Sequence, residues 1–407
     1  FMSCTALQTV NLPDRATVIG TFAFAACTAL KTVNISENSN LQRFGSNAFS
    51  GCTSLSYMYI PKSVQNTPYV DENTTQEYAI GDYAFMNTAL VNVEFAAGGE
   101  GELSIGQGAF AGCGGITGYD GKGNPIIESM SVINLPSRLA PIYIVWQDAS
   151  GAIYSETREG ISARVFSGNT QTLLQQINIA EGGQYYGSMG GVVYKLAERN
   201  GEYVKDDLML IPANFNGTLT IPYTVTQIGS RLSTSGQTVV QSTSAKISKI
   251  EFEATPEGEE AVPLTIGHGA FKGVTSFTSI TFPDRLVEIG NSAFASTKLT
   301  SIHLPASLET LGEYAFQSVT TATSITFDAD IKIDKIAKSA FQGCSKITSL
   351  VIPKNVRTID YMAFSGCSKV TSLAFAEDSQ LATVMGLAFQ NMQFTSLSLP
   401  DTFTTID

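Results

Sequence analysis

The chain has 407 residues, of which 15% are charged, and 36 acidic residues against 24 basic ones give a formal net charge of −12. An acidic chain without a Lys/Arg patch is a poor partner for nucleic acid or an anionic membrane, so we expect neither partner. No apolar run reaches the ~18 residues of a transmembrane helix, so we expect no membrane insertion by this segment.

One short unit recurs along the chain, and its plainest copy reads FQGCSKITSLVIPKNVRTIDYMAF. Each copy closes on an Ala-Phe pair, and most copies are 22 to 25 residues apart. Phe1 and Phe166 hold the same place as the Phe of these pairs, which are Phe24, Phe49, Phe85, Phe110, Phe271, Phe294, Phe316, Phe341, Phe364 and Phe389. Such a period predicts a solenoid, because one unit cannot bury its apolar face without its neighbours.

The sequence after each repeat Phe predicts a short strand. It has the form L-x-x-I-x-I-P, as in residues 55–61, 277–283 and 347–353, with the alternation of a half-buried strand. A second apolar pair then predicts another short extended segment. Adjacent rungs should lie about 4.8 Å apart along the strand columns, and the repeat Phe residues should form an internal stack. A Gly four residues before most Phe residues indicates either positive φ or close backbone approach. We expect no long helix.

In chain order, residues 1–110 are regular repeats with one insertion at 62–80, which we interpret as a surface loop. Residues 111–270 are irregular and 271–407 are the cleanest array, together making one solenoid domain over 1–407. The irregular part should contain a hairpin at 118–129, strands at 143–146 and 174–179, a hairpin turning at 199–201, and a Ser/Thr-rich loop at 230–246. The chain begins and ends inside a repeat, so we expect it to be a piece of a longer protein.

The pattern C-[TS]-x-L-x-x-I-x-I-P-x-x-V-x-x-I-G-x-x-A-F resembles the BspA-type leucine-rich repeat. The resemblance implies a β-rich leucine-rich-repeat solenoid of the α/β solenoid class, with about 13–14 rungs, short strands, little helix and insertions in the middle. Residues 190–229 resemble a family variant in which a hairpin replaces the Ala-Phe turn. Members are typically secreted or cell-surface bacterial proteins, and some are adhesins for host proteins. A signal and an anchor are expected outside this chain.

The six cysteines form a column, because each follows a repeat Phe by three residues: Cys4, Cys27, Cys52, Cys113, Cys344 and Cys367. Val274 and Val319 fill the same slot, which favours a small buried apolar group and free thiols. Disulfides between neighbouring rungs are the alternative, since the rung spacing is within the permitted Cα distance. With only His268 and His303 and no C-x-x-C, we expect no metal site and no cofactor.

Two side chains per rung should point outward from the strands, and these are the candidate ligand-binding surface. The outward pairs are small and polar except for Tyr57 and Tyr59, which carry aromatic rings typical of protein interfaces and able to stack on sugars. The alternative is that two tyrosines merely cover a sheet surface. The other outward candidates are Asn34, Asn92, Glu94 and His303.

Trp146 with Tyr143 and Tyr154 forms a second aromatic group, which either packs its insertion onto the solenoid or binds a ligand. The acidic residues of 251–260 lack the spacing of a calcium loop and are interpreted as a solvated segment. No G-x-S-x-G elbow, Walker loop or triad-like His occurs, so no catalytic residue is proposed and we expect no enzyme.

These observations predict a recognition module that binds another protein, with adhesion to a host protein as the leading case. A glycan-binding module is the first alternative, and a structural spacer in a larger surface protein is the second. The sequence names no particular ligand.

Overall fold

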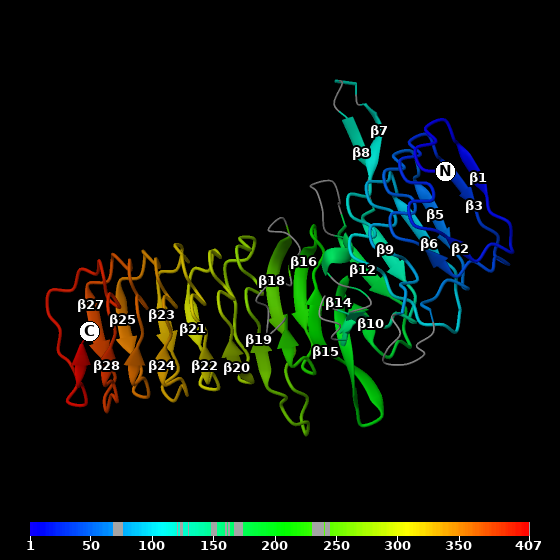
Figure 1. Cartoon of the computed structure of the whole chain (residues 1–407). Coiled ribbons are helices and arrows are strands. Elements are labelled where there is room, and N and C mark those ends of the chain that lie inside the picture. Colours follow the sequence, from blue (N-terminus) through cyan, green and yellow to red (C-terminus); the bar gives the residue numbers. More distant parts are fainter. Residues whose placement is uncertain are drawn as a thin grey trace. The chain divides into compact units, whose positions relative to one another are not determined.

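The computed structural model describes residues 1–67, 76–119, 121–122, 125–128, 130–147, 153–158, 161, 163–166, 174–229, 240 and 245–406, and describes only the backbone of 115–119, 125–128, 143–147, 153–157 and 163–164 (Figure 1). Two compact units form, Phe1–Val204 and Lys205–Asp407, each with its own stack of repeats. Their boundary lies inside the predicted irregular part, and one continuous solenoid over 1–407 stays a prediction.

Unit 1 has two columns of parallel strands, because each rung contributes one strand to each column. The first column contains β1 (Thr9–Asn11), β3 (Thr32–Asn34), β5 (Tyr57–Ile60), β6 (Asn92–Phe95), β9 (Val132–Leu135) and β12 (Gln176–Ile179). The second contains β2 (Val18–Ile19) and β4 (Arg43–Phe44), continued by bridges at Ile80, Ile105 and Leu139. The predicted alternation is confirmed, since Met58 and Ile60 are buried while Tyr57 is exposed.

Three insertions of unit 1 are antiparallel hairpins, since neighbouring strands joined by a short turn must reverse direction. They are β7 (Gly115–Tyr119) with β8 (Pro125–Glu128), β10 (Ile142–Gln147) with β11 (Ile153–Arg158), and β13 (Tyr186–Met189) with β14 (Val192–Arg199). Figure 1 shows β7 and β8 projecting from the stacked repeats. The predicted turn at 199–201 is confirmed by left-handed φ at Asn200 and Gly201. The only described helical segment is η1 (Ala163–Phe166).

Unit 2 repeats the two columns. The first contains β16 (Asn216–Ile221), β18 (Lys246–Phe252), β21 (Ile302–Leu304), β23 (Ile325–Phe327), β25 (Ser349–Ile352) and β27 (Ser372–Phe375). The second contains β15 (Glu202–Leu210), β17 (Gln227–Ile228), β19 (Leu264–Ile266), β20 (Leu286–Ile289), β22 (Thr310–Leu311), β24 (Lys335–Ile336), β26 (Thr358–Ile359), β28 (Thr383–Val384) and β29 (Thr405–Ile406).

Two strand predictions in unit 2 are wrong. Residues 277–283 and 394–400 have the strand pattern but form no strand. Phe277 and Phe282 are buried as the pattern requires, whereas Leu397 and Leu399 are exposed. In the first of these segments side-chain burial therefore follows the repeat although the backbone does not join the parallel ladder.

The repeat Phe residues stack through both units, as predicted. In unit 1 the successive ring centroids from Phe1 to Phe166 are 5.3 to 6.1 Å apart. In unit 2 the centroids from Phe271 to Phe389 are 5.3 to 5.9 Å apart. The rings are within 18° of parallel, at spacings normal for stacked aromatic pairs.

The Phe turn bonds each rung to the next through its backbone. Phe49 N donates to Ala84 O at 2.8 Å, and Phe316 N donates to Ala340 O at 2.8 Å. The residues two before and two after the Phe also donate to the next rung, as Asn47 N does to Asp82 O at 2.9 Å. Both positions have left-handed φ in successive rungs, including at non-Gly residues such as Asn47 and Ser318. The hydrogen bonds to the next rung offset the energetic cost of this backbone conformation.

At Gly81 and Gly312, the Gly four residues before the Phe allows close approach of two rungs and is not there for positive φ. A Cβ on Gly81 would lie 2.6 Å from Ser46 N, and one on Gly312 would lie 2.5 Å from Asn291 N, both on the preceding rung. Neither glycine has positive φ. The structure therefore supports close backbone approach, and not positive φ, as the reason for these glycines.

The cysteine column is buried except at Cys4, and all six thiols are free. Each buried Sγ donates to the backbone carbonyl of the repeat Phe one rung earlier, as Cys52 does to Phe24 O at 3.1 Å and Cys344 to Phe316 O at 3.4 Å. Burial raises the pKa of the Cys52 thiol to about 12. The structure therefore has the free thiols, and not the disulfides, of the two alternatives.

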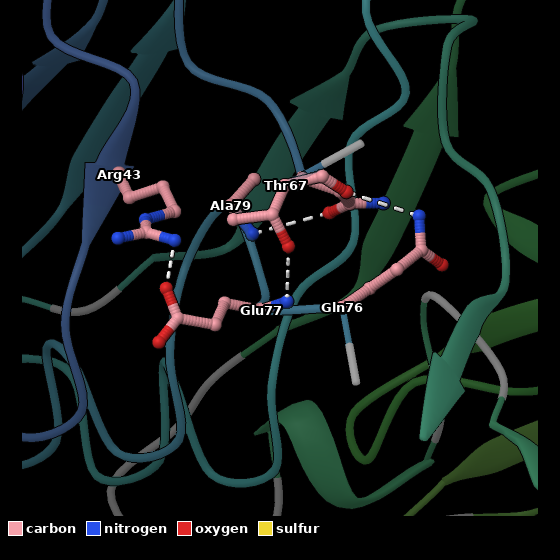
Figure 2. A network of polar contacts seen from close by, with 6 residues as sticks. Arg43, Thr67, Gln76, Glu77 and Ala79 are labelled. Carbon is pink, nitrogen blue, oxygen red and sulfur yellow. Dashed lines mark hydrogen bonds and ion pairs between the residues drawn. The ribbon is translucent and has the colours of Figure 1, made fainter. Parts of the chain in front are cut away.

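The insertion at 62–80 is not a simple surface loop, because both of its described ends are anchored in unit 1 by buried residues such as Asn66 and Ala79. Asn66 Nδ2 donates to Ser104 Oγ at 2.9 Å, and Ala79 N donates to Asn66 Oδ1 at 3.1 Å. Figure 2 shows Thr67 facing Glu77, whose N donates to Thr67 Oγ1 at 2.6 Å, and Arg43 paired with the Glu77 carboxylate. Residues 68–75 lie outside the described residues.

Candidate functional site

The outward face of β5 and β6 carries the predicted surface. In the parallel register Tyr57 lies opposite Asn92 and Tyr59 opposite Glu94. The alternate residues Met58 and Val93 are buried, so the period of two sends these four side chains outward. Tyr57 is 40% exposed, and its hydroxyl donates to Glu94 Oε2 at 2.6 Å.

These side chains line a hollow that extends over the neighbouring strands of unit 1. Its volume is about 640 Å³, and its side chains include Asn11, Asn34, Glu37, Tyr57, Tyr59 and Glu94. We call it the Tyr57 groove. On its far side Asn34 Nδ2 donates to Asn11 Oδ1 at 2.7 Å, linking β3 to β1. The groove thus joins four successive rungs, which is why residues distant in sequence meet there.

The groove is electronegative, and its carboxylates are among the causes that raise the pKa of both tyrosines. Burial first, and then the hydrogen bond and charge of Glu94, raise the pKa of Tyr57 to about 12. Burial, followed by the charges of Glu37 and Glu94, also raises the pKa of Tyr59. Both phenols are therefore neutral at physiological pH and present their aromatic faces beside two carboxylates.

The predicted residues divide into three groups. Asn34, Tyr57, Tyr59 and Glu94 come together in the groove, and Asn92 is the register partner of Tyr57 on β6. His303 lies in unit 2 on β21, where Nδ1 is 3.0 Å from Thr326 Oγ1 and Nε2 is 3.2 Å from Asp328 Oδ1. The backbone of Trp146 is in β10, but its side chain and those of Tyr143 and Tyr154 lie outside the described residues.

Glu37 is a groove residue that the sequence did not indicate. It lies just after β3, next to Ser36, which occupies the slot that holds Pro61 and Pro353 in other rungs. Glu37 and Ser36 both line the hollow. The absence of Pro from this slot is the signal that could have drawn attention to Glu37.

Other chemistry is sparse in the described part of the chain. Among those residues no three His, Cys, Asp or Glu side chains lie close enough together to hold a metal ion. No described helix is long and apolar enough to cross a membrane. Glu251 is engaged by Lys249 Nζ at 2.6 Å and belongs to the exposed acidic segment that the sequence predicted.

Several solved structures are similar to this chain. One is a leucine-rich repeat protein from Eubacterium ventriosum, with 18% identity, 98% of this chain and 81% of that chain covered, and a TM-score of 0.47. Another is the pneumococcal vaccine antigen PcpA, with 16% identity, 97% and 73% coverage, and a TM-score of 0.46. A third is a leucine-rich repeat protein from Bacteroides ovatus, with 16% identity, 100% and 85% coverage, and a TM-score of 0.42.

No curated protein matches the sequence. The family model for the BspA type leucine rich repeat region matches in six copies, over residues 1–70, 73–122, 243–371 and 334–407. These matches cover more than half of the chain and include the rungs that build the Tyr57 groove. With its two strand columns, its Phe stack and its scarcity of helix, the chain is a leucine-rich-repeat protein and belongs to the BspA-type family.

Proposed function

We propose that this chain is a recognition module of a secreted or cell-surface bacterial protein, and that its Tyr57 groove binds another protein. A host protein is the expected class of partner, as the family resemblance implies. The observation that carries the proposal is the groove itself, in which two tyrosines lie on a hollow of about 640 Å³. Partly exposed aromatic side chains in a concavity are the usual anchors of protein interfaces.

The strand scaffold supports this assignment. Tyr57 and Tyr59 extend from a strand whose alternate side chains, Met58 and Ile60, are fully packed in the core. The backbone beneath the tyrosines is bonded to β6 over four residue pairs. A contact surface built on such a strand loses little conformational entropy on binding, which favours recognition.

The test is a binding panel of host extracellular proteins and glycans, measured with the wild-type chain and a Tyr57→Ser/Tyr59→Ser variant. We expect a protein hit that the double variant loses by at least about tenfold, since aromatic anchors commonly contribute more than 1.4 kcal/mol each. The matched control is Val351→Ser on β25, which changes an outward residue of unit 2 that is 55% exposed.

The other outcomes separate the alternatives. A glycan hit competed by free sugar supports glycan capture in the groove and contradicts protein binding there, since tyrosine rings also stack on sugars. A protein hit that both variants retain moves the site away from the Tyr57 groove. A panel without any hit favours the structural spacer.

A further inference from the structure

The charged residues that line the Tyr57 groove indicate the charge of the ligand that it binds. Its charged lining residues are Glu37 and Glu94, and the described lining includes no Lys, Arg or His. The whole chain has a formal net charge of −12, so the long-range field has the same sign as the local one. An anionic ligand would have to overcome both fields, whereas a cationic one is attracted by both.

The two carboxylates have capacity left for a ligand. Glu94 accepts the Tyr57 hydroxyl through Oε2 at 2.6 Å, and none of the described residues bonds to its other oxygen. Glu37 has no hydrogen bond or ion pair with any described side chain. A carboxylate forms its strongest hydrogen bonds with a ligand that brings its own positive charge.

The tyrosines add a second attraction of the same kind. Because the Tyr57 hydroxyl is already directed to Glu94, the remaining surface that it offers is its ring. The negative face of a phenol ring attracts an ammonium or guanidinium group within about 6 Å of its centre. Both rings are neutral at physiological pH, because burial first, and then nearby carboxylates that include Glu94, raise the pKa of Tyr57 and Tyr59 above the ordinary tyrosine value.

We propose that the Tyr57 groove binds a basic side chain, Arg or Lys, presented by the partner protein. The inference rests on the proposed function, because it names the chemistry that the same groove recognises. Arg fits better than Lys, since a planar guanidinium can stack on a tyrosine ring and also donate paired hydrogen bonds to a carboxylate. Asn34 lies on the same hollow, and because its Nδ2 donates to Asn11, its Oδ1 is the atom that can accept a hydrogen bond from the backbone of the segment that carries the side chain.

The test uses three short capped peptides that differ only in a central Arg, Lys or citrulline, the last being a neutral analogue of Arg. Binding to the full chain is followed by NMR of labelled tyrosine, with Tyr57→Phe and Tyr59→Phe to assign the signals. We expect the Tyr57 and Tyr59 signals to shift saturably with the Arg peptide by about 10 mM, where a millimolar complex is already saturated. The citrulline peptide should bind at least about tenfold more weakly.

Two conservative variants and one control complete the design. Glu37→Gln and Glu94→Gln should each weaken Arg-peptide binding by about fivefold to tenfold, because each removes a negative charge without removing volume. Glu257→Gln removes the same charge from the exposed acidic segment of unit 2 and should leave binding unchanged. Raising the salt concentration should weaken the Arg peptide and not the citrulline peptide.

Three results overturn the inference: equal binding of the Arg and citrulline peptides, no shift of either tyrosine by the Arg peptide, or unchanged affinity in both Gln variants. These three results do not contradict the proposed function if the panel protein binds the wild-type chain and fails to bind the Tyr57→Ser/Tyr59→Ser variant. If instead the panel protein binds that variant normally while the Arg peptide shifts Tyr57, the groove takes basic groups but is not the protein-binding site.

Discussion

Strands β5 and β6 of unit 1 and strands β25 and β27 of unit 2 have the same parallel register and differ on one face only. The inward pairs are apolar in both units, Met58 with Val93 in unit 1 and Leu350 with Leu373 in unit 2. The outward pairs of unit 1 are Tyr57 with Asn92 and Tyr59 with Glu94, whereas unit 2 has Ser349 with Ser372 and Val351 with Ala374.

The repeat therefore constrains the side chains of the inner face and allows those of the outer face to vary. Inner side chains pack against the rungs before and after, so their size is fixed by two neighbours. Outer side chains of β25 meet only solvent and the adjacent strand, and small residues suffice there. A hollow with aromatic and acidic side chains on β5 and β6 therefore carries information that the fold does not require.

The largest expected effect is on the shared inner face. Phe85→Ala in unit 1 and Phe341→Ala in unit 2 should each lower the free energy of unfolding by about 3–5 kcal/mol, because each removes a fully buried ring stacked on both sides. Urea unfolding of the two variants measures it. A loss below about 1 kcal/mol in either unit would mean that its rings do not form a packed core.

The next effect tests the close approach of rungs in the two units. Gly81→Ala and Gly312→Ala should each cost about 1–3 kcal/mol, because the new Cβ would lie 2.6 Å or less from backbone atoms that cannot rotate away. Gly20→Ala is the matched control, since a Cβ there meets no atom within 4 Å. Thermal unfolding of the three variants separates them, and equal Tm values would contradict the steric explanation.

The sequence predicted the inner face well because its period records packing. The Phe stack, the strand columns, the buried Cys slot and the outward position of Tyr57 all follow from residues that recur every 22 to 25 positions. Each recurrence is a constraint from a neighbouring rung, so it is visible even in a single sequence.

The sequence did not reveal features that depend on departures from the period or on the backbone alone. Glu37 lines the groove in a rung that lacks the usual Pro, and Asn66 is buried with hydrogen bonds to Ser104 and Ala79 that the repeat spacing does not predict. The left-handed positions around the Phe turn are filled by unrelated residue types, because the ladder to the next rung fixes the backbone there: they include Phe22, Asn47, Tyr83, Ser292 and Met362. No single residue type marks such a position.

A smaller effect is expected in the cysteine slot, which is alike in both units. Cys52→Val and Cys344→Val should change the free energy of unfolding by no more than about 1.5 kcal/mol, because Val274 and Val319 already fill this slot while buried. The lost thiol bond leaves the Phe24 carbonyl with the N–H of Cys27, at 3.2 Å. Chemical denaturation with and without reductant measures the change, and a much larger loss under oxidising conditions alone would indicate that disulfides form.

The smallest stability effect is expected on the outer face, where the two units differ. Tyr57→Ser should change the free energy of unfolding at neutral pH by no more than about 0.5 kcal/mol, as for other exposed sites. The measurable property of Tyr57 in the folded chain is the titration of its hydroxyl. Burial first, then Glu94, raises the pKa of Tyr57 to about 12, so the folded chain holds this proton more tightly than the unfolded chain, whose tyrosines titrate near about 10.

The associated stability is therefore fully present below about pH 10 and is lost as the pH rises toward about 12. Ultraviolet absorbance of the phenolate, taken as the wild-type minus Tyr57→Phe difference, should show the delayed titration. Glu94→Gln should shift it only part of the way back, because burial, the largest cause, remains. If this absorbance difference titrates at the ordinary tyrosine pKa, the hollow does not desolvate Tyr57. Strands β5 and β25 would then differ only in the size of their outward side chains.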